Sequence, residues 1–162
     1  MTIKEYLPGI PSTYWQDYLK AIEVTKPLIL LPGTKNMALF NGIVDKRGLI
    51  LQFVLSTNSP DLVFTLIADD RKITATITQM IEAGYVGYYV PELPWLSIAD
   101  STTSAYMVNL ITDVPFKRNV YGYVSNPSTS TITVLGMGFH AIIFNKGFYK
   151  ALADLKAGKE IT

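Results

Sequence analysis

His140 is the only histidine in the chain, so any acid–base chemistry that uses an imidazole would depend on it. A serine-type hydrolase would combine this base with a hydroxyl nucleophile and an orienting carboxylate. However, His140 lies inside the β-branched and aromatic run Phe139–Ile143, and such a run is typical of a strand. We therefore predict a structural histidine on a strand that faces a loop or a partner. One histidine also cannot supply the several histidine ligands of common catalytic zinc sites.

The acidic residues do not form a catalytic pair at a recognisable spacing. Glycosidases need two carboxylates that face each other across a cleft. Asp69 and Asp70 are adjacent in a predicted turn and should point apart, while Asp61, Asp100 and Asp113 are scattered along the chain. The sequence also lacks an Asp-x-Asp-x-Asp-Gly calcium loop. We interpret Asp69 and Asp70 as solvated turn charges, with an incidental calcium ion as the open alternative.

The signatures of nucleotide cofactors are incomplete. Gly33-Thr34-Lys35 reverses the Gly-Lys-Thr order of a phosphate loop, and Gly136-x-Gly138 lacks the third glycine of a dinucleotide fingerprint. Cysteine is absent, which excludes disulfides, thiolate nucleophiles and cysteine-ligated zinc. The sequence therefore predicts neither a cofactor nor a metal.

The charge balance argues against nucleic acid as the main partner. The net charge is +1, and Lys46-Arg47 and Arg71-Lys72 are isolated basic pairs, too few to follow a phosphate backbone. The amino end lacks the apolar core of a signal peptide. The uncharged stretch 119–145 lacks the ~20 continuous apolar residues of a membrane-spanning helix. We expect no nucleic acid partner and no transmembrane segment, and leave membrane contact open.

An aromatic cluster is the one unusual local feature of the sequence. Tyrosine and tryptophan in loops often make contacts, because their rings bury much area at little entropic cost. The loop from Tyr85 to Trp95 is therefore either a platform for carbohydrate or protein, or a loop packed over one edge of a sheet. The candidate interface residues come from this loop, from a later strand and from both ends of the chain: Tyr88, Tyr89, Trp95, Tyr121, Tyr123, Trp15 and Phe148.

The composition describes one folded domain with few charges. A length of 162 residues fits a single domain, and a hydrophobic content of 49% excludes intrinsic disorder. Charged residues make up 17% of the chain, against roughly 25% in an ordinary soluble domain. Only six of them fall between Ile73 and Asn145. A surface this poor in charge is prone to association, so we expect it to be buried against other subunits.

Helices are predicted at the two ends of the chain. Ser12 is a candidate N-cap, and the apolar residues after it recur at i, i+4 as Tyr14, Tyr18 and Ile22. This pattern predicts a helical arm within residues 1–26. A second helix is predicted within residues 146–162, where apolar residues share one face and lysines lie near the carboxyl end.

Between these ends the apolar pattern changes to period two, which predicts strands. Asn58–Asp61 is expected to turn a hairpin, Asp69–Lys72 to form a second turn, and residues 77–81 to form a short helix. The strands are expected at 28–31, 37–40, 48–56, 62–67, 105–112, 120–125, 131–135 and 139–144. Seven or eight short strands without intervening helices favour an all-β sandwich or jelly roll over residues 27–145.

The order of these segments resembles the single jelly-roll capsid proteins of tailless icosahedral viruses with an internal membrane. The likeness covers residues 27–145, and the terminal helices are not part of it. It rests on Asn58-Ser59-Pro60-Asp61-Leu62, Asp69-Asp70, Ile81-Glu82-Ala83-Gly84-Tyr85, Pro115-Phe116 and Asn126-Pro127. The resemblance implies an oligomeric coat subunit of a virion, with upright strands and no catalytic residues to transfer.

From the charge pattern and this resemblance we expect a non-enzymatic structural subunit of a viral capsid or similar protein shell. Its partners would be copies of itself and other coat proteins. The alternative is a carbohydrate- or receptor-binding β-sandwich of the fibre or adhesin type, which would use the loop from Tyr85 to Trp95. A hydrolase built on His140 is a third class. The mass of the protein in solution separates the first class from the other two.

Overall fold

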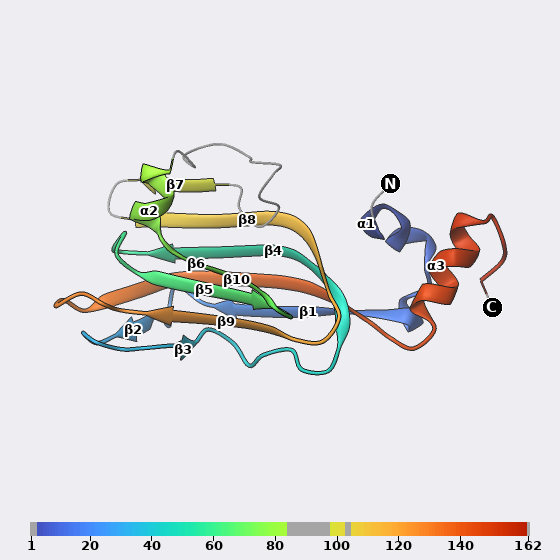
Figure 1. The fold of residues 1–162 in the computed structure, drawn as a ribbon, viewed down its shortest axis with the longest axis horizontal. Coiled ribbons are helices and arrows are strands. Elements are labelled where there is room, and N and C mark those ends of the chain that lie inside the picture. The colour runs from blue at the N-terminus through green and yellow to red at the C-terminus, as the bar shows by residue number, and fades with distance from the viewer. Residues whose placement is uncertain (1–2, 84–97, 103–104, 162) are drawn as a thin grey trace.

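The computed structural model describes residues 3–83, 98–102 and 105–161, and these form two antiparallel sheets packed face to face, with short helices at both ends (Figure 1). This is the predicted all-β sandwich. The strands are more numerous than the predicted seven or eight, because the described residues contain ten. No helix in the described part of the chain is long and apolar enough to cross a membrane.

The large sheet has six strands in the order β1-β10-β4-β8-β7, and β2 also pairs with β10. Its strands are β1 (Trp15–Ile22), β2 (Leu28–Leu30), β4 (Arg47–Thr57), β7 (Ile98–Thr102), β8 (Ala105–Phe116) and β10 (Ile132–Phe144). The small sheet has four strands in the order β3-β9-β5-β6. They are β3 (Met37–Ala38), β5 (Val63–Ala68), β6 (Arg71–Thr76) and β9 (Val120–Ser125).

The main core lies between the two sheets. Alternate residues of the facing strands point into it, as the period-two pattern predicts. Phe53 and Phe139 reach it from the large sheet and Phe64 from the small sheet, and each of these side chains is at most 1% exposed. Phe40 stacks on Phe139 with ring centroids 4.5 Å apart, so the loop after β3 also closes the core.

A second core joins the helices at the two ends of the chain to the outer face of the large sheet. These helices are α1 (Ile3–Tyr6) and α3 (Phe148–Lys156), and 3-10 turns lie at Leu7–Gly9 and Ser12–Tyr14. The remaining helix, α2 (Ile77–Glu82), packs on the main core through Ile77 and Met80. α1 and α3 sit together beyond one end of the sandwich (Figure 1). Buried residues of this end pack on Leu49, Leu51, Ile142 and Phe144, which project from β4 and β10. The predicted C-terminal helix and the short helix after residue 76 are thus confirmed as α3 and α2.

The predicted helix beginning at Ser12 is wrong. Ser12–Tyr14 form a single 3-10 turn, and the next eight residues form β1, which pairs with β10 along its whole length. A recurrence at i, i+4 fits a strand as well as a helix, because four is also a multiple of the strand period of two. The ring of Tyr18 packs edge-on against Phe40 and Phe139, which fixes this strand over the core. The short N-terminal helix is α1 instead.

The predicted hairpin around Asn58–Asp61 is also wrong, because this turn joins the two sheets. β4 already has β10 and β8 as neighbours, so neither of its edges is open to β5. Asn58 stays with the large sheet, where its side chain accepts a bond from the Thr133 backbone N–H at 2.9 Å. The turn then carries the chain into the small sheet, where β5 pairs with β6 and β9.

Two further differences concern β6 and β10. The predicted strands at 131–135 and 139–144 are one strand, β10, which continues through Gly136 and Gly138. Its register with β4 shifts between Val134 and Gly136 and between His140 and Ala141. Arg71 and Lys72, expected in a turn, begin β6. The true hairpin of this region is β5–β6, and Asp69 turns it with a left-handed φ of 57°. The other predicted strands are confirmed within a few residues at each end.

Candidate functional site

The outer face of the small sheet brings together residues from three strands. Tyr121 and Tyr123 of β9 lie opposite Ile67 and Thr65 of β5, and Thr65 in turn lies opposite Thr74 of β6. The residues between them in sequence are buried in the core, so these side chains point outward. We call this surface the tyrosine face, and it consists of Val63, Thr65, Ile67, Lys72, Thr74, Thr76, Tyr121, Tyr123 and Ser125.

The two tyrosine rings are held in place by their neighbours. Their centroids are 6.1 Å apart and their planes are inclined by 18°, so they stack along the strand. Tyr121 also lies directly against the backbone of Gly42, where an added Cβ would be 2.4 Å from the ring. The hydroxyls of Thr65 and Thr74 are 3.1 Å apart and link β5 to β6. Side chains that are already ordered lose little entropy when a partner covers them.

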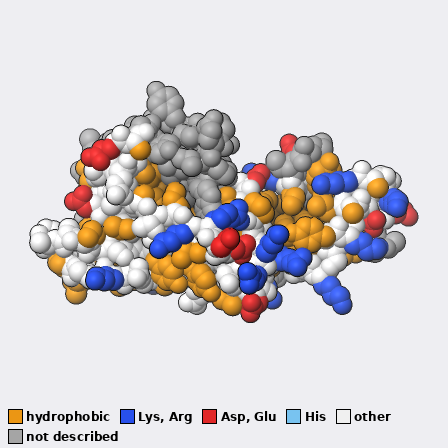
Figure 2. All heavy atoms as spheres, viewed as in Figure 1, with side chains coloured by type: hydrophobic (Ala, Val, Ile, Leu, Met, Phe, Trp, Pro, Cys, Tyr) orange, Lys and Arg blue, Asp and Glu red, His pale blue; other side chains and the backbone are white. Residues whose placement is uncertain are grey.

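The tyrosine face is almost free of charge, and Lys72 is its only charged residue. In Figure 2 this face is turned towards the viewer, and it shows a hydrophobic patch over β5 and β9 with Lys and Arg side chains beside it. Protein interfaces are typically poor in charge at their centres and enriched in aromatic residues. The arrangement therefore suits a contact with another protein, and it unites two of the predicted interface residues, Tyr121 and Tyr123.

A second apolar surface, not predicted from the sequence, follows β1 and β2. Exposed large hydrophobic residues concentrate here: Leu19 is 65% exposed, Val24 77%, Ile29 58% and Leu31 65%. β1 pairs with β10 on one side, and within the described residues no strand pairs with its other side. An open edge strand with apolar neighbours is a common place for pairing with another chain. The sequence pattern predicts a helix where β1 forms, so it does not predict this open strand edge.

The remaining predicted interface residues lie elsewhere. Trp15 is half-buried, and its indole N–H donates to the Ile10 carbonyl at 3.1 Å. Phe148 is 1% exposed and stacks on Phe144 with centroids 3.8 Å apart. Both rings therefore fasten the helical end to its own sheet, and we leave them out of the interface proposed below. Tyr88, Tyr89 and Trp95, with the rest of the loop from Tyr85, lie outside the described residues.

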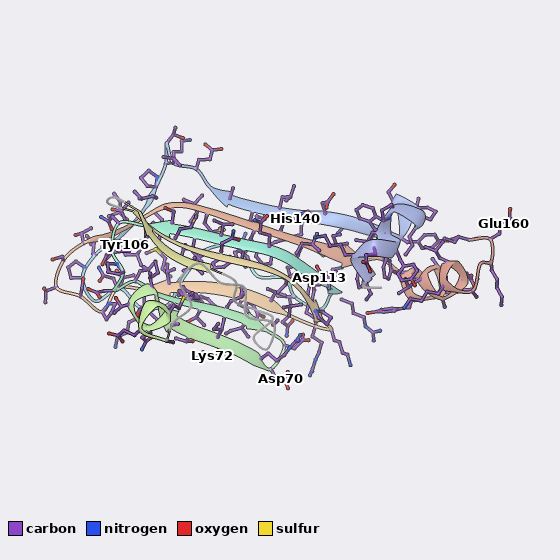
Figure 3. The ribbon with its side chains drawn as sticks, turned by 90° about the horizontal axis from the view of Figure 1, so that it is seen from above. Asp70, Lys72, Tyr106, Asp113, His140 and Glu160 are labelled. Carbon is purple, nitrogen blue, oxygen red and sulfur yellow. The ribbon has the colours of Figure 1, made fainter. Side chains whose placement is uncertain are left out.

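The imidazole of His140 contacts the carboxylate of Asp17 across two strands of the large sheet. Its Nε2 atom lies 2.7 Å from Oδ1 of Asp17, which is two residues from the partner of His140 in the β1–β10 register. Figure 3 shows the two layers, with His140 in the layer of β1 and β10 and Asp70 and Lys72 in the other. The hollow beside His140 is lined by Leu19, Lys20, Ala21, Gln52, Val54, Gly138 and Phe139, none of which carries a hydroxyl nucleophile. The contact joins β1 to β10.

Asp69 has a structural role that its place in an acidic turn did not indicate. Its carboxylate accepts the backbone N–H groups of Lys117 and Arg118 at 2.8 Å and of Asn119 at 3.0 Å. Burial opposes ionisation of this carboxyl, but the three N–H donors and the nearby Arg71 outweigh burial, so the pKa of Asp69 lies below its usual range. Asp69 thus ties the β5–β6 turn to the loop before β9.

No group of three or more His, Asp or Glu side chains is placed to hold a metal ion in the part of the chain that the structure describes. Asp69 is occupied with backbone donors, and Asp70 is exposed beside it.

Comparison with known proteins yields distant structural neighbours only. No family model and no curated protein matches the sequence. A family two carbohydrate esterase from Cellvibrio japonicus is 8% identical with a TM-score of 0.33, over 80% of this chain and 35% of the other. The VP2 subviral particle of infectious bursal disease virus is 12% identical with a TM-score of 0.36, over 84% and 34%. The structure of the Gt strain of this virus is also 12% identical, with a TM-score of 0.33, over 83% and 33%.

The chain thus spans about a third of the length of each neighbour. At these TM-scores the likeness carries no conclusion about function. The β-sandwich itself follows from the strand pairing described above.

Proposed function

We propose that this chain is a non-enzymatic structural subunit of a viral capsid or similar protein shell, located in the virion. In this proposal it acts by self-assembly, through contacts with copies of itself and with other coat proteins. The observation that carries the proposal is the tyrosine face, an ordered surface with a single charged residue on the outside of the small sheet.

Self-assembly through the tyrosine face is favoured because exposure of its apolar groups to water is unfavourable. The tyrosine rings share this face with the apolar side chains of Val63 and Ile67, and a partner that covers the face removes their apolar area from water. A specific contact would bury at least ~1,000 Å² in total. The open edge of β1 gives the subunit a second place for contact, and a closed shell needs more than one interface for each subunit.

A second candidate function is a carbohydrate- or receptor-binding module. The stacked rings of Tyr121 and Tyr123 favour it, because planar apolar rings also form platforms for small ligands. This candidate differs from the first in one respect that is easily measured, since a binding module of this kind functions without self-association.

The test replaces residues of the tyrosine face and measures assembly and fold separately. Tyr121→Glu places a charge on the face beside Ile67, and Thr65→Lys places one in its central row without removing either stacked ring. Thr129→Glu, in the exposed turn before β10, is the matched control. We expect both face variants to lower the sedimentation-average mass at micromolar concentration and the control to leave it unchanged, while circular dichroism retains the β spectrum.

Equal masses for the Thr65→Lys variant, the control and the wild type would overturn the assignment of this face. A monomeric wild type would overturn self-assembly itself and favour the binding module.

A further inference from the structure

The fold gathers most of the basic residues at one end of the sandwich. Four turns meet there, at residues 43–47, 69–72, 117–119 and 145–150, and we call them together the basic end. They carry eight Lys and Arg residues: Lys46, Arg47, Arg71, Lys72, Lys117, Arg118, Lys146 and Lys150. The same turns carry three aspartates, Asp45, Asp69 and Asp70, so their net charge is +5 and that of the rest of the chain is −4. Lys150 also pairs with Asp154 of α3, at 3.4 Å between Nζ and Oδ2.

Hydrogen bonds and strand register show that these turns are neighbours. The backbone N–H of Lys46 donates to the Arg118 carbonyl at 3.0 Å, and Asp69 holds the loop at 117–119 through the three bonds described above. The guanidinium of Arg71 donates to the Pro115 carbonyl. Arg47 lies opposite Phe144 in the register of β4 and β10, which brings the turn at 145–150 to the same end. The basic pairs that look isolated in the sequence are therefore one cluster.

The surface of the basic end contains two hollows. One hollow of about 390 Å³ is lined by Asp69, Asp70, Arg71, Pro115, Lys117 and Arg118. Another, of about 300 Å³, lies over the start of α3 and includes Arg47, Lys146, Tyr149 and Lys150 in its wall. Tyr149 is 47% exposed, although its ring packs edge-on against Phe144 and Phe148. Figure 2 shows Lys and Arg side chains gathered where the sandwich meets the helical end.

We propose that the basic end binds single-stranded nucleic acid, with phosphates at the two hollows and a base against the ring of Tyr149. Proteins that bind single strands combine a basic groove along the backbone with exposed aromatic rings on which bases stack. A flexible chain can enter two hollows, whereas a flat lipid surface would touch only the side chains that project furthest. This proposal goes beyond the structural role above, because it assigns a ligand to the basic end, which shares only Lys72 with the tyrosine face.

The test measures binding of a fluorescein-labelled oligothymidylate of about 20 nucleotides, longer than the roughly 4–16 nucleotides that one such domain covers. Fluorescence anisotropy follows binding to the full chain over a series of salt concentrations. The test variant combines Lys46→Glu, Lys117→Glu and Lys146→Glu. The control combines Lys26→Glu, Lys35→Glu and Lys159→Glu, which are exposed, lie outside the basic end and change the net charge equally.

We expect the wild type to bind, the test variant to lose at least about tenfold in affinity, and the control to lose much less. Each phosphate contact contributes about 0.7 to the slope of log K against log salt for single strands, so the slope of the test variant should be smaller by about 2. Tyr149→Ala should weaken binding with little change in this slope, because stacking releases no counterion.

Three outcomes would overturn the proposal. These are no binding by the wild type at low salt, an equal loss in both triple variants, and binding to phosphatidylserine vesicles but not to the oligonucleotide. The third would assign the basic end to an anionic lipid surface. Sedimentation of the same samples records their assembly state, so a failure of nucleic acid binding is distinguishable from a failure of self-assembly.

Discussion

Replacement of Asp69 tests whether one carboxylate holds the β5–β6 turn against the loop before β9. Asp69→Ala removes the acceptor of three backbone N–H groups and places alanine at a φ of 57°. Asp69→Asn keeps a side-chain oxygen and tolerates this φ, but removes the negative charge. The adjacent Asp70→Asn is the control, because it makes the same change of net charge at an exposed position.

The expected magnitude follows from the contacts that are lost. A hydrogen bond contributes about 1 kcal/mol net, and alanine in the left-handed region adds about 1 kcal/mol. Water reaches part of this half-exposed turn and replaces some of the lost acceptors. We therefore expect Asp69→Ala to lower the free energy of unfolding by about 2–3 kcal/mol, and Asp69→Asn by about 1 kcal/mol. Urea unfolding at neutral pH, followed by circular dichroism, measures both.

The pH dependence gives an independent check on the cause. The pKa of Asp69 is lower in the folded protein than in the unfolded chain, so its ionised form stabilises the fold. This stabilisation is complete above the unfolded pKa of about 3.9 and is lost as the pH falls through the folded value. The difference between wild type and Asp69→Asn should shrink over that acidic range. An Asp69→Ala variant as stable as Asp70→Asn at neutral pH would refute the reasoning.

Other substitutions test the two cores and the histidine. Phe148→Ala should cost about 3–5 kcal/mol in urea unfolding, because this ring is 1% exposed and stacks on Phe144; a cost below about 1 kcal/mol would contradict the second core. Gly48→Ala should lower the melting temperature strongly, since its Cβ would lie 2.0 Å from the Ile142 carbonyl oxygen, whereas Gly138→Ala, with nothing within 4 Å, should be tolerated. His140→Gln should change stability by no more than about 1 kcal/mol and leave the sedimentation profile unchanged; a large loss of assembly in a folded variant would give His140 a role beyond its contact with Asp17.

The fold class could be predicted from the sequence because period-two patterning records which residues face a core. The pattern failed where two periods coincide, and the recurrence of Tyr14, Tyr18 and Ile22 led to a helix where β1 forms. The pattern also does not indicate which strands pair with each other. The turn at Asn58–Asp61 has the chemistry of a hairpin, but whether the chain returns to the same sheet depends on which edges other strands already occupy.

The candidate surfaces show the same limit. Tyr121 and Tyr123 could be predicted as neighbours on one face, since alternate residues of a strand share a face. The apolar edge of β1 and the basic end could not, because both depend on contacts between segments far apart in sequence. Lys46 and Arg118 are far apart in the sequence, yet a backbone hydrogen bond joins them. The sequence indicates a solvated charge at Asp69, because the three N–H groups that it accepts lie in a loop far away along the chain.

The measurement that tests the central claim most directly is the mass of the wild-type protein in solution as a function of its concentration. Sedimentation equilibrium of the full chain, from nanomolar to high micromolar concentration, reports this mass without labels or variants. Burial of the tyrosine face against another copy predicts a mass that rises with concentration to a dimer or a larger species. A constant mass of 18.0 kDa over the whole range would contradict self-assembly as the function of this protein.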